Sequence, residues 1–158
     1  MYIAGRYGLF TIVISPLVAL MNDMVGSLKL KNYKAVEKIT GETSQVEREK
    51  IMSDIAEGRC HMLFVAPELL LARSSIEQLI GDRTIGMIVV DEAHIVTTWG
   101  KQFRPDYWFL GAHIAKLRKH QTRDKGRSFV IAAFIATAVY GGIENMYQHR
   151  SDDERLRR

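Results

Sequence analysis

The chain has 158 residues, 47% hydrophobic and 25% charged, a composition that excludes a disordered polypeptide. This length suits one domain with a core and is too short for two ordinary domains. The net charge of +4 and the pI near 9.3 suit a polyanionic partner such as nucleic acid, although proteins with neutral partners can be equally basic. The single cysteine, Cys60, excludes an internal disulfide and indicates a reducing compartment.

The first apolar stretch, residues 9–21, imitates a secretory signal peptide. It is too short to span a bilayer, and no small-residue cleavage site follows it. A buried strand at 11–15 is the better interpretation. The pattern then predicts an amphipathic helix over 18–30, because apolar residues recur there at helical spacing.

Strands and helices alternate along the rest of the chain. Ser44 and Glu47 have the spacing of a capping box, which predicts a charged helix that Gly58 ends. Pro67 fits the first position of a short helix through residue 71. The other expected strands are 33–39, 61–66, 85–91 and 128–134, and the other helices are 74–80, 105–119 and a weaker one from 142, with a polar segment at 121–127.

This alternation predicts right-handed crossovers and a mostly parallel sheet. The expected fold is therefore a three-layer α/β domain with helices on both faces of the sheet. Residues 1–149 form one such unit, and residues 150–158 form a charged tail.

Two acids follow the apolar strand at 85–90. Ligands in open α/β folds collect at the carboxyl ends of strands, where Asp91 could hold a hydrated Mg²⁺ and Glu92 could orient a water. The plainer alternative is that both acids only cap the following turn. In sequence, Asp91-Glu92-Ala93-His94 resembles the DEAH-type Walker B motif of superfamily 2 helicases.

Aromatic residues crowd the segment that follows. Flat rings stack on unpaired bases at about 1–3 kcal/mol each, and an Arg pairs with phosphate. Trp99 and Phe103 sit among loop residues, whereas Tyr107 starts a helix and could equally belong to the core. The pattern Trp99-Gly-x-x-Phe103-Arg104-Pro-x-Tyr107 resembles the aromatic-rich loop of RecQ-family DNA helicases, which senses single-stranded DNA.

The RecQ resemblance implies a RecA-like, P-loop NTPase helicase domain that uses ATP and Mg²⁺. It makes Asp91 the acid that holds Mg²⁺ through water and Glu92 the base that orients the attacking water. His94 and Thr137 become coupling residues, although Ile135 stands where the family has a second hydroxyl residue.

Two further segments resemble helicase motifs Ia and Ib, which contact the DNA backbone. Ser15, Pro16 and Asn22 belong to the first, at the start of a helix whose free amides favour phosphate. Pro67 and Glu68 belong to the second. Ser15 is the best single candidate for a DNA contact, and the alternative is that Pro16 simply starts a helix.

No P-loop pattern, Gly-x-x-x-x-Gly-Lys-Ser/Thr, occurs in the chain. By resemblance, the chain is an N-terminally truncated first RecA-like domain without the second domain. We expect the P-loop strand of the family beside the strand that carries Asp91, so its loss would leave open sheet edges and favour self-association. The isolated chain should have little or no catalysis.

The sequence thus predicts part of a RecQ-like, ATP-dependent 3′-to-5′ DNA helicase that acts on single-stranded DNA and duplex junctions, in DNA repair or recombination. It would lie with the genome, at a bacterial nucleoid or in a nucleus, with no membrane partner. Two alternatives stay open. One is a non-enzymatic module that binds single-stranded DNA or a protein, and the other is a fragment of a DEAH or DEAD RNA helicase, which the aromatic loop disfavours.

Overall fold

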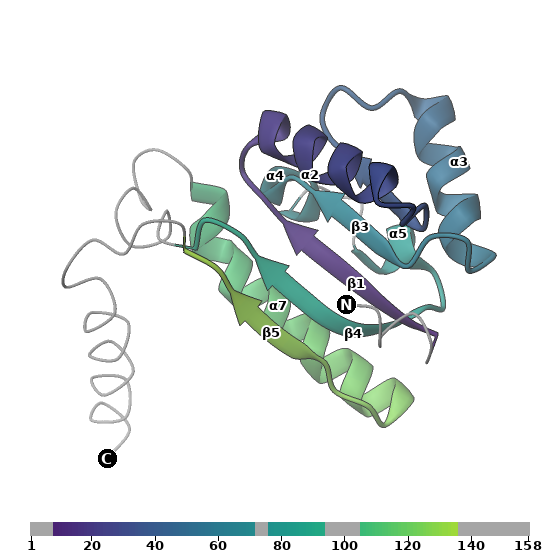
Figure 1. Ribbon diagram of the computed structural model, residues 1–158. Helices are drawn as coiled ribbons and strands as arrows, with labels where there is room; N and C mark the ends of the chain where they lie inside the picture. The colour runs from purple at the N-terminus through teal and green to yellow at the C-terminus, as the bar shows by residue number, and fades with distance from the viewer. Residues whose placement is uncertain (1–7, 72–75, 94–104, 136–158) are drawn as a thin grey trace, which may run out of the picture.

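A five-stranded, fully parallel sheet forms the centre of the computed structural model, which describes residues 8–71, 76–93 and 105–135. The strands are β1 (Leu9–Ile14), β2 (Val36–Ile39), β3 (Met62–Val65), β4 (Thr84–Val90) and β5 (Val130–Ala133). Their order is β2-β3-β1-β4-β5, and every neighbouring pair is parallel (Figure 1). The α/β fold class is confirmed, and the expected strand ends shift by only a few residues.

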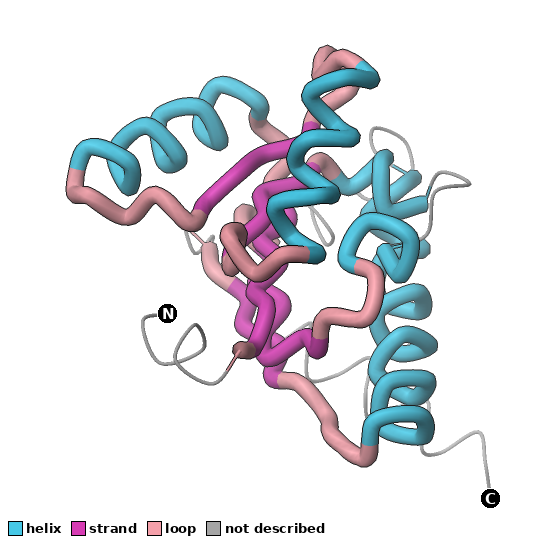
Figure 2. Tube along the Cα trace, turned by 90° about the vertical axis from the view of Figure 1, so that its right-hand side faces the viewer, coloured by secondary structure: helices cyan, strands magenta, loops and turns pink. Residues whose placement is uncertain are grey.

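Helices cover both faces of this sheet, as Figure 2 shows in a view turned by 90°. One face packs against α2 (Val18–Leu30). The other packs against α3 (Gln45–Ala56), α4 (Pro67–Leu71), α5 (Ile76–Ile80) and α7 (Pro105–Lys125). This is the expected three-layer arrangement.

Side-chain alternation along β1 divides the core between these faces. Phe10, Ile12 and Ile14 are fully or almost fully buried on the face of α3 and α7, and Val13 packs on the face of α2. Successive side chains of a strand point to opposite faces, so a central strand must be apolar at nearly every position. This explains why residues 9–14 are as apolar as part of a signal peptide although they form the central strand of the sheet.

The capping box before α3 is confirmed. The Ser44 hydroxyl accepts a hydrogen bond from the Glu47 N–H, and the Glu47 carboxylate accepts from the Ser44 N–H at 3.1 Å. Hydrogen bonds from the Ser44 side chain and backbone lower the pKa of Glu47. Just past α3, Gly58 has a φ of +73°, the left-handed conformation that glycine accepts readily.

One expected boundary was wrong, because α7 continues through most of the polar segment at 121–127. It ends at Lys125, before Gly126 with a φ of +62°. Two features stabilise the extension. Arg123 and Lys125 place positive charge at the helix C-terminus, and Gln121 is buried and hydrogen-bonded rather than exposed.

The expected vacancy beside the Asp91 strand was also wrong. Strand β4 has β1 on one side and β5 on the other, so both hydrogen-bonding edges are occupied. The outer strands of the described sheet are β2 and β5. Any open edge therefore lies away from Asp91.

The predicted helix from 142 and the charged tail lie outside the described residues. Within the ranges that the structure covers, no helix has the length and apolar content that crossing a membrane requires.

Candidate functional site

The carboxyl ends of β1, β3 and β4 bring the predicted motifs to one edge of the sheet. Ser15 follows β1, Ala66 and Pro67 follow β3, and Asp91 follows β4. Because these three strands are adjacent and parallel, residues far apart in sequence become neighbours (Figure 1).

Hydrogen bonds join these strand ends into a continuous row. The Ser15 N–H donates to the Val65 carbonyl at 3.1 Å, and the Asp91 N–H donates to the Ile14 carbonyl at 2.8 Å. The Ser15 hydroxyl then donates to Oδ2 of Asp91 at 3.3 Å. Asp91 is thus held through its backbone by Ile14 and through its carboxylate by Ser15.

The row continues on the side of β5. Phe134 N–H donates to the Val90 carbonyl, and Ala93 N–H donates to the Phe134 carbonyl, both at 2.9 Å. Hydrogen bonds from β1 and from the end of β5 therefore fix the turn at residues 91–93 from two sides. Glu92, between them, has a φ of 50°, a left-handed conformation that is uncommon for a side-chain-bearing residue. Such strain persists where the surroundings over-determine it, often at functional sites.

The first predicted DNA-contact segment has mixed exposure. Ser15 is 0% exposed, and its hydroxyl faces Asp91 rather than solvent. Pro16 is buried too. Asn22 lies on the exposed side of α2, where its amide oxygen accepts a hydrogen bond from the Lys38 ammonium. A direct DNA contact by these residues stays a prediction.

The second predicted segment opens α4 as expected. Pro67 is buried at the first helical position, and Glu68 is exposed beside it. Their contact with DNA is likewise still a prediction.

Most of the predicted aromatic loop and both predicted coupling residues fall outside the described ranges. Trp99, Phe103, Arg104, His94 and Thr137 lie outside the described residues. Tyr107 falls in the first turn of α7.

The donor set at this edge fits a magnesium ion held partly through water. Carboxylate oxygens are the ligands Mg²⁺ prefers, and it usually keeps several waters beside one or two carboxylates. Asp91 and Glu92 are both half-exposed, so water can reach them. No cluster of three or more metal-ligating side chains occurs in the described ranges.

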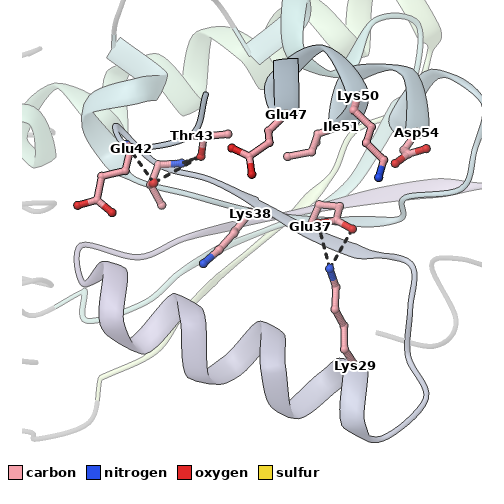
Figure 3. Close-up of a pocket in the computed structure, with 10 residues that line it drawn as sticks. Lys29, Glu37, Lys38, Glu42, Thr43, Glu47, Lys50, Ile51 and Asp54 are labelled. Atoms are coloured by element: carbon pink, nitrogen blue, oxygen red, sulfur yellow. Dashed lines mark hydrogen bonds and ion pairs between the residues drawn. The ribbon is translucent and has the colours of Figure 1, made fainter. Parts of the chain in front are cut away.

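A cavity of about 420 Å³ lies elsewhere, between α2, β2 and α3 (Figure 3). Lysine and carboxylate side chains line it together, and Lys29 pairs with Glu37 at 3.0 Å. This mixture gives no excess of positive charge for a phosphate. The Asp91 edge, which carries the two acids, is therefore the candidate functional site, and this cavity is not.

Sequence reasoning missed one residue that supports the site strand. Gln121 of α7 is 7% exposed, and its amide bonds both the N–H and the carbonyl of Ile85 at 2.9 Å. Its place on the buried stripe with Leu110, Ile114 and Leu117 was the available signal. A polar residue on such a stripe needs buried partners.

Comparison with solved structures defines the class of fold as that of helicase core domains. The MrfA helicase of the DUF1998 type, in a crystal structure with DNA, matches with a TM-score of 0.63 and 16% identity over 87% of this chain and 19% of that one. The Hef helicase domain of Pyrococcus furiosus matches with a TM-score of 0.57 and 19% identity over 90% of this chain and 27% of that one.

Sequence comparison then gives the family. A model of the DEAD/DEAH box helicase family matches residues 4–141, and the chain belongs to this family. The ATP-dependent DNA helicase RecQ of Synechocystis is 38% identical over 130 residues, which are 81% of this chain and 26% of that protein. The helicase SGS1 of Saccharomyces cerevisiae is 40% identical over 101 residues, 61% of this chain and 7% of that protein. The chain thus spans about a quarter of the first relative's length.

Proposed function

We propose that this chain is the first RecA-like unit of a RecQ-like, ATP-dependent DNA helicase. The whole protein would couple ATP hydrolysis to 3′-to-5′ movement along single-stranded DNA and to unwinding at duplex junctions. The observation that carries the proposal is the hydrogen-bonded row at the carboxyl edge, which joins the Ser15 and Asp91 segments.

Each acid has its own part in the proposed reaction. Asp91 would hold Mg²⁺ through water, and Glu92 would orient the attacking water, since phosphoryl transfer depends mainly on positioning and charge neutralisation. The magnesium ion, when bound, would neutralise the charge on the phosphates of ATP. His94 and Thr137 would couple this site to the DNA.

The DNA would lie over the same edge. Pro16, Asn22, Pro67 and Glu68 belong to the two segments that meet the backbone by resemblance, and Ser15 joins the first of them. In the loop, Trp99, Phe103, Arg104 and Tyr107 would meet the bases and phosphates.

A second candidate function is a module that binds single-stranded DNA without hydrolysis. The sequence observation in its favour is that these 158 residues hold no phosphate cradle of their own. ATP hydrolysis would need that cradle and the arginine finger of a second domain. Where it has been measured, an arginine finger raises the rate of hydrolysis by about 10³–10⁵-fold.

Hydrolysis of Mg²⁺-ATP with and without single-stranded DNA tests both candidates, with Glu92→Gln as the matched control. We expect no turnover from the chain alone and retained DNA binding. DNA-stimulated turnover that disappears in Glu92→Gln would mean that a cradle is supplied in another way, such as by a different partner chain. Absence of DNA binding under all conditions would contradict both candidates.

We propose that the isolated chain associates with a second copy of itself through the β5 edge. Val130 is 59% exposed and Ile131 43% exposed, and β5 carries neither charge nor proline. The opposite outer strand, β2, carries Glu37 and Lys38, the charges that natural proteins use to protect an edge. A two-fold axis at β5 would pair two copies antiparallel.

Sedimentation velocity tests this association. Ile131→Lys should shift the chain toward monomer, because a charge at the edge opposes pairing. Leu30→Lys is the matched control, since Leu30 is 90% exposed on α2, away from β5. A wild-type chain that sediments as one monomeric species contradicts the proposal.

The proposed substrate also sets the location. A DNA helicase works where the genome is, at the nucleoid of a bacterium or in a nucleus.

A further inference from the structure

The side-chain hydrogen bond between Ser15 and Asp91 links two segments to which the proposed function gives different ligands. The hydroxyl of Ser15 donates to Oδ2 of Asp91 at 3.3 Å across 76 positions of sequence. Asp91 belongs to the proposed metal site, and Ser15 begins the segment proposed to meet the DNA backbone. The bond is therefore a direct physical connection between these two sites.

Ser15 is held too firmly to move independently of either neighbour. Its side chain is 0% exposed, and its N–H donates to the Val65 carbonyl of β3 at 3.1 Å. The adjacent Ile14 carbonyl accepts the Asp91 N–H at 2.8 Å. A displacement at the end of β1 would thus shift Asp91 through both its backbone and its carboxylate.

The segment after Ser15 is suited to such a displacement. Only Pro16 and Leu17 separate Ser15 from α2, and Leu17 caps that helix without a side-chain hydrogen bond. By contrast, Ser44 and Glu47 occupy the free amides at the start of α3. Among the described residues, no side chain is recorded as accepting from the first-turn amides of α2, and an incoming phosphate could bind them.

We propose that Ser15 is a positioning residue that couples DNA binding at the start of α2 to the carboxylate of Asp91. The inference rests on the proposed function. DNA at α2 sets the position of the Ser15 hydroxyl, and the hydroxyl sets the orientation in which Asp91 meets the metal ion. Ser15 acts through Asp91 and touches neither ATP nor the metal.

Thermodynamic linkage supplies a test that does not need ATP turnover. If DNA changes the affinity for a metal ion, the metal ion must change the affinity for DNA by the same factor. The probe is Mn²⁺ in place of Mg²⁺, followed by paramagnetic broadening of the Ala93 amide resonance in the 158-residue chain. The titration is run with and without a deoxythymidine oligonucleotide. The same titration of Asp91→Asn, which lacks the proposed metal-binding carboxylate, measures the broadening caused by Mn²⁺ bound to the oligonucleotide.

We expect the oligonucleotide to change the Mn²⁺ dissociation constant of the wild-type chain by about five-fold or more. In Ser15→Ala the ratio of the Mn²⁺ dissociation constants with and without the oligonucleotide should fall to about one, whatever the affinity for either ligand alone. Fluorescence anisotropy of the labelled oligonucleotide, with and without Mn²⁺, should give the reciprocal factor.

A second pair of variants covers the case in which Ser15→Ala fails to fold. Ser15→Thr and Ser15→Val add the same bulk to this buried position, but only the Thr variant keeps the hydroxyl. Linkage should persist in the Thr variant and vanish in the Val variant. A loss of packing alone would affect the two variants equally.

Three results would overturn the inference, and they are distinguishable. Linkage that survives Ser15→Ala or Ser15→Val removes Ser15 from the coupling. A wild-type chain that binds both ligands without linkage shows that the sites are independent, while the proposed function stands. Broadening at Ala93 that persists in Asp91→Asn without DNA, or absence of oligonucleotide binding, overturns the proposed function together with the inference.

Discussion

Buried polar side chains at both ends of the sheet hold strands in place through specific hydrogen bonds. At the carboxyl end Ser15 bonds to Asp91, and at the opposite end Gln121 bonds to the backbone of Ile85. A buried polar group that loses its partner destabilises a protein, so both side chains contribute to stability.

Replacing Gln121 by Ala should lower the free energy of unfolding by about 1–3 kcal/mol, because it leaves the Ile85 N–H and carbonyl without a partner. Thr122→Ala, one residue along on the exposed side of α7, should change the free energy of unfolding by less than about 0.5 kcal/mol. Urea unfolding of the two variants checks this. Equal midpoints would show that Gln121 does not hold β4.

His61 should make the stability depend on pH. Arg83 donates to Nδ1 of His61 at 3.1 Å, and burial, followed by the Arg83 charge, lowers the pKa of His61 from its usual 6.5. As the pH falls through 6.5, the unfolded chain takes up the proton first, so the stability falls with decreasing pH until the lowered pKa is passed.

His61→Asn tests this dependence, since an amide oxygen can accept from Arg83 and does not titrate. Urea midpoints at about pH 8 and about pH 5.5 should differ less in this variant than in the wild type, because between these pH values the unfolded wild-type chain protonates His61, whose pKa is lowered in the folded chain. The other four histidines are common to both proteins. An equal difference in the two proteins would rule out the role of His61.

At the scale of strands and helices, Gly86 marks an irregular join between β1 and β4. The register shifts between Phe10 and Thr11, and a Cβ on Gly86 would lie 2.8 Å from the Cβ of Leu9. Side-chain atoms cannot approach so closely, so the glycine permits the two central strands to pair.

Gly86→Ala should lower the free energy of unfolding by about 1–3 kcal/mol through overpacking. Gly26→Ala in α2 should have the opposite sign and stabilise by about 0.5–1 kcal/mol, as alanine favours a helix interior. A Cβ on Gly26 meets nothing within 4 Å. Thermal unfolding of the two variants checks this. If both variants shift the Tm in the same direction, the effect of Gly86→Ala does not come from the close approach of β1 and β4.

Local patterns predicted most of these elements. Helical spacing gave α2, and the Ser44–Glu47 spacing gave the start of α3, since both depend on residues close in sequence. The extension of α7 escaped prediction because Gln121 is stabilised by Ile85, which is 36 positions away. The strand order could not be predicted for the same reason. The strand that carries Asp91 was expected to have an open edge, but β5 pairs with it there.

Sequence also predicted that the candidate site residues follow strands but gave no contacts between them. The motif residues Asp91 and Ser15 were each expected after a strand, and both are there. Their hydrogen bond depends on β1 and β4 being neighbours, which no local pattern encodes. Hence the sequence predicted a DNA contact for Ser15, and the fold reveals a bond to Asp91.

At the scale of the whole molecule, the proposed functional residues lie at one edge of the sheet. The carboxyl edge holds the acids and the proposed DNA segments, while the opposite edge holds Gln121 and His61, which support the strands. The helicase and binding-module candidates share the claim that this carboxyl edge, with the loop after Asp91, binds single-stranded DNA.

The binding of a labelled deoxythymidine oligonucleotide, measured by fluorescence anisotropy, tests that claim most directly. We predict binding that weakens as salt rises, since phosphate contacts release counterions. Trp99→Ala should weaken binding by about 1–3 kcal/mol, the contribution of one stacked base. Phe109→Ala, which removes a ring that is 60% exposed on α7, should leave binding unchanged. The absence of binding, or an equal loss in the two variants, would contradict the account.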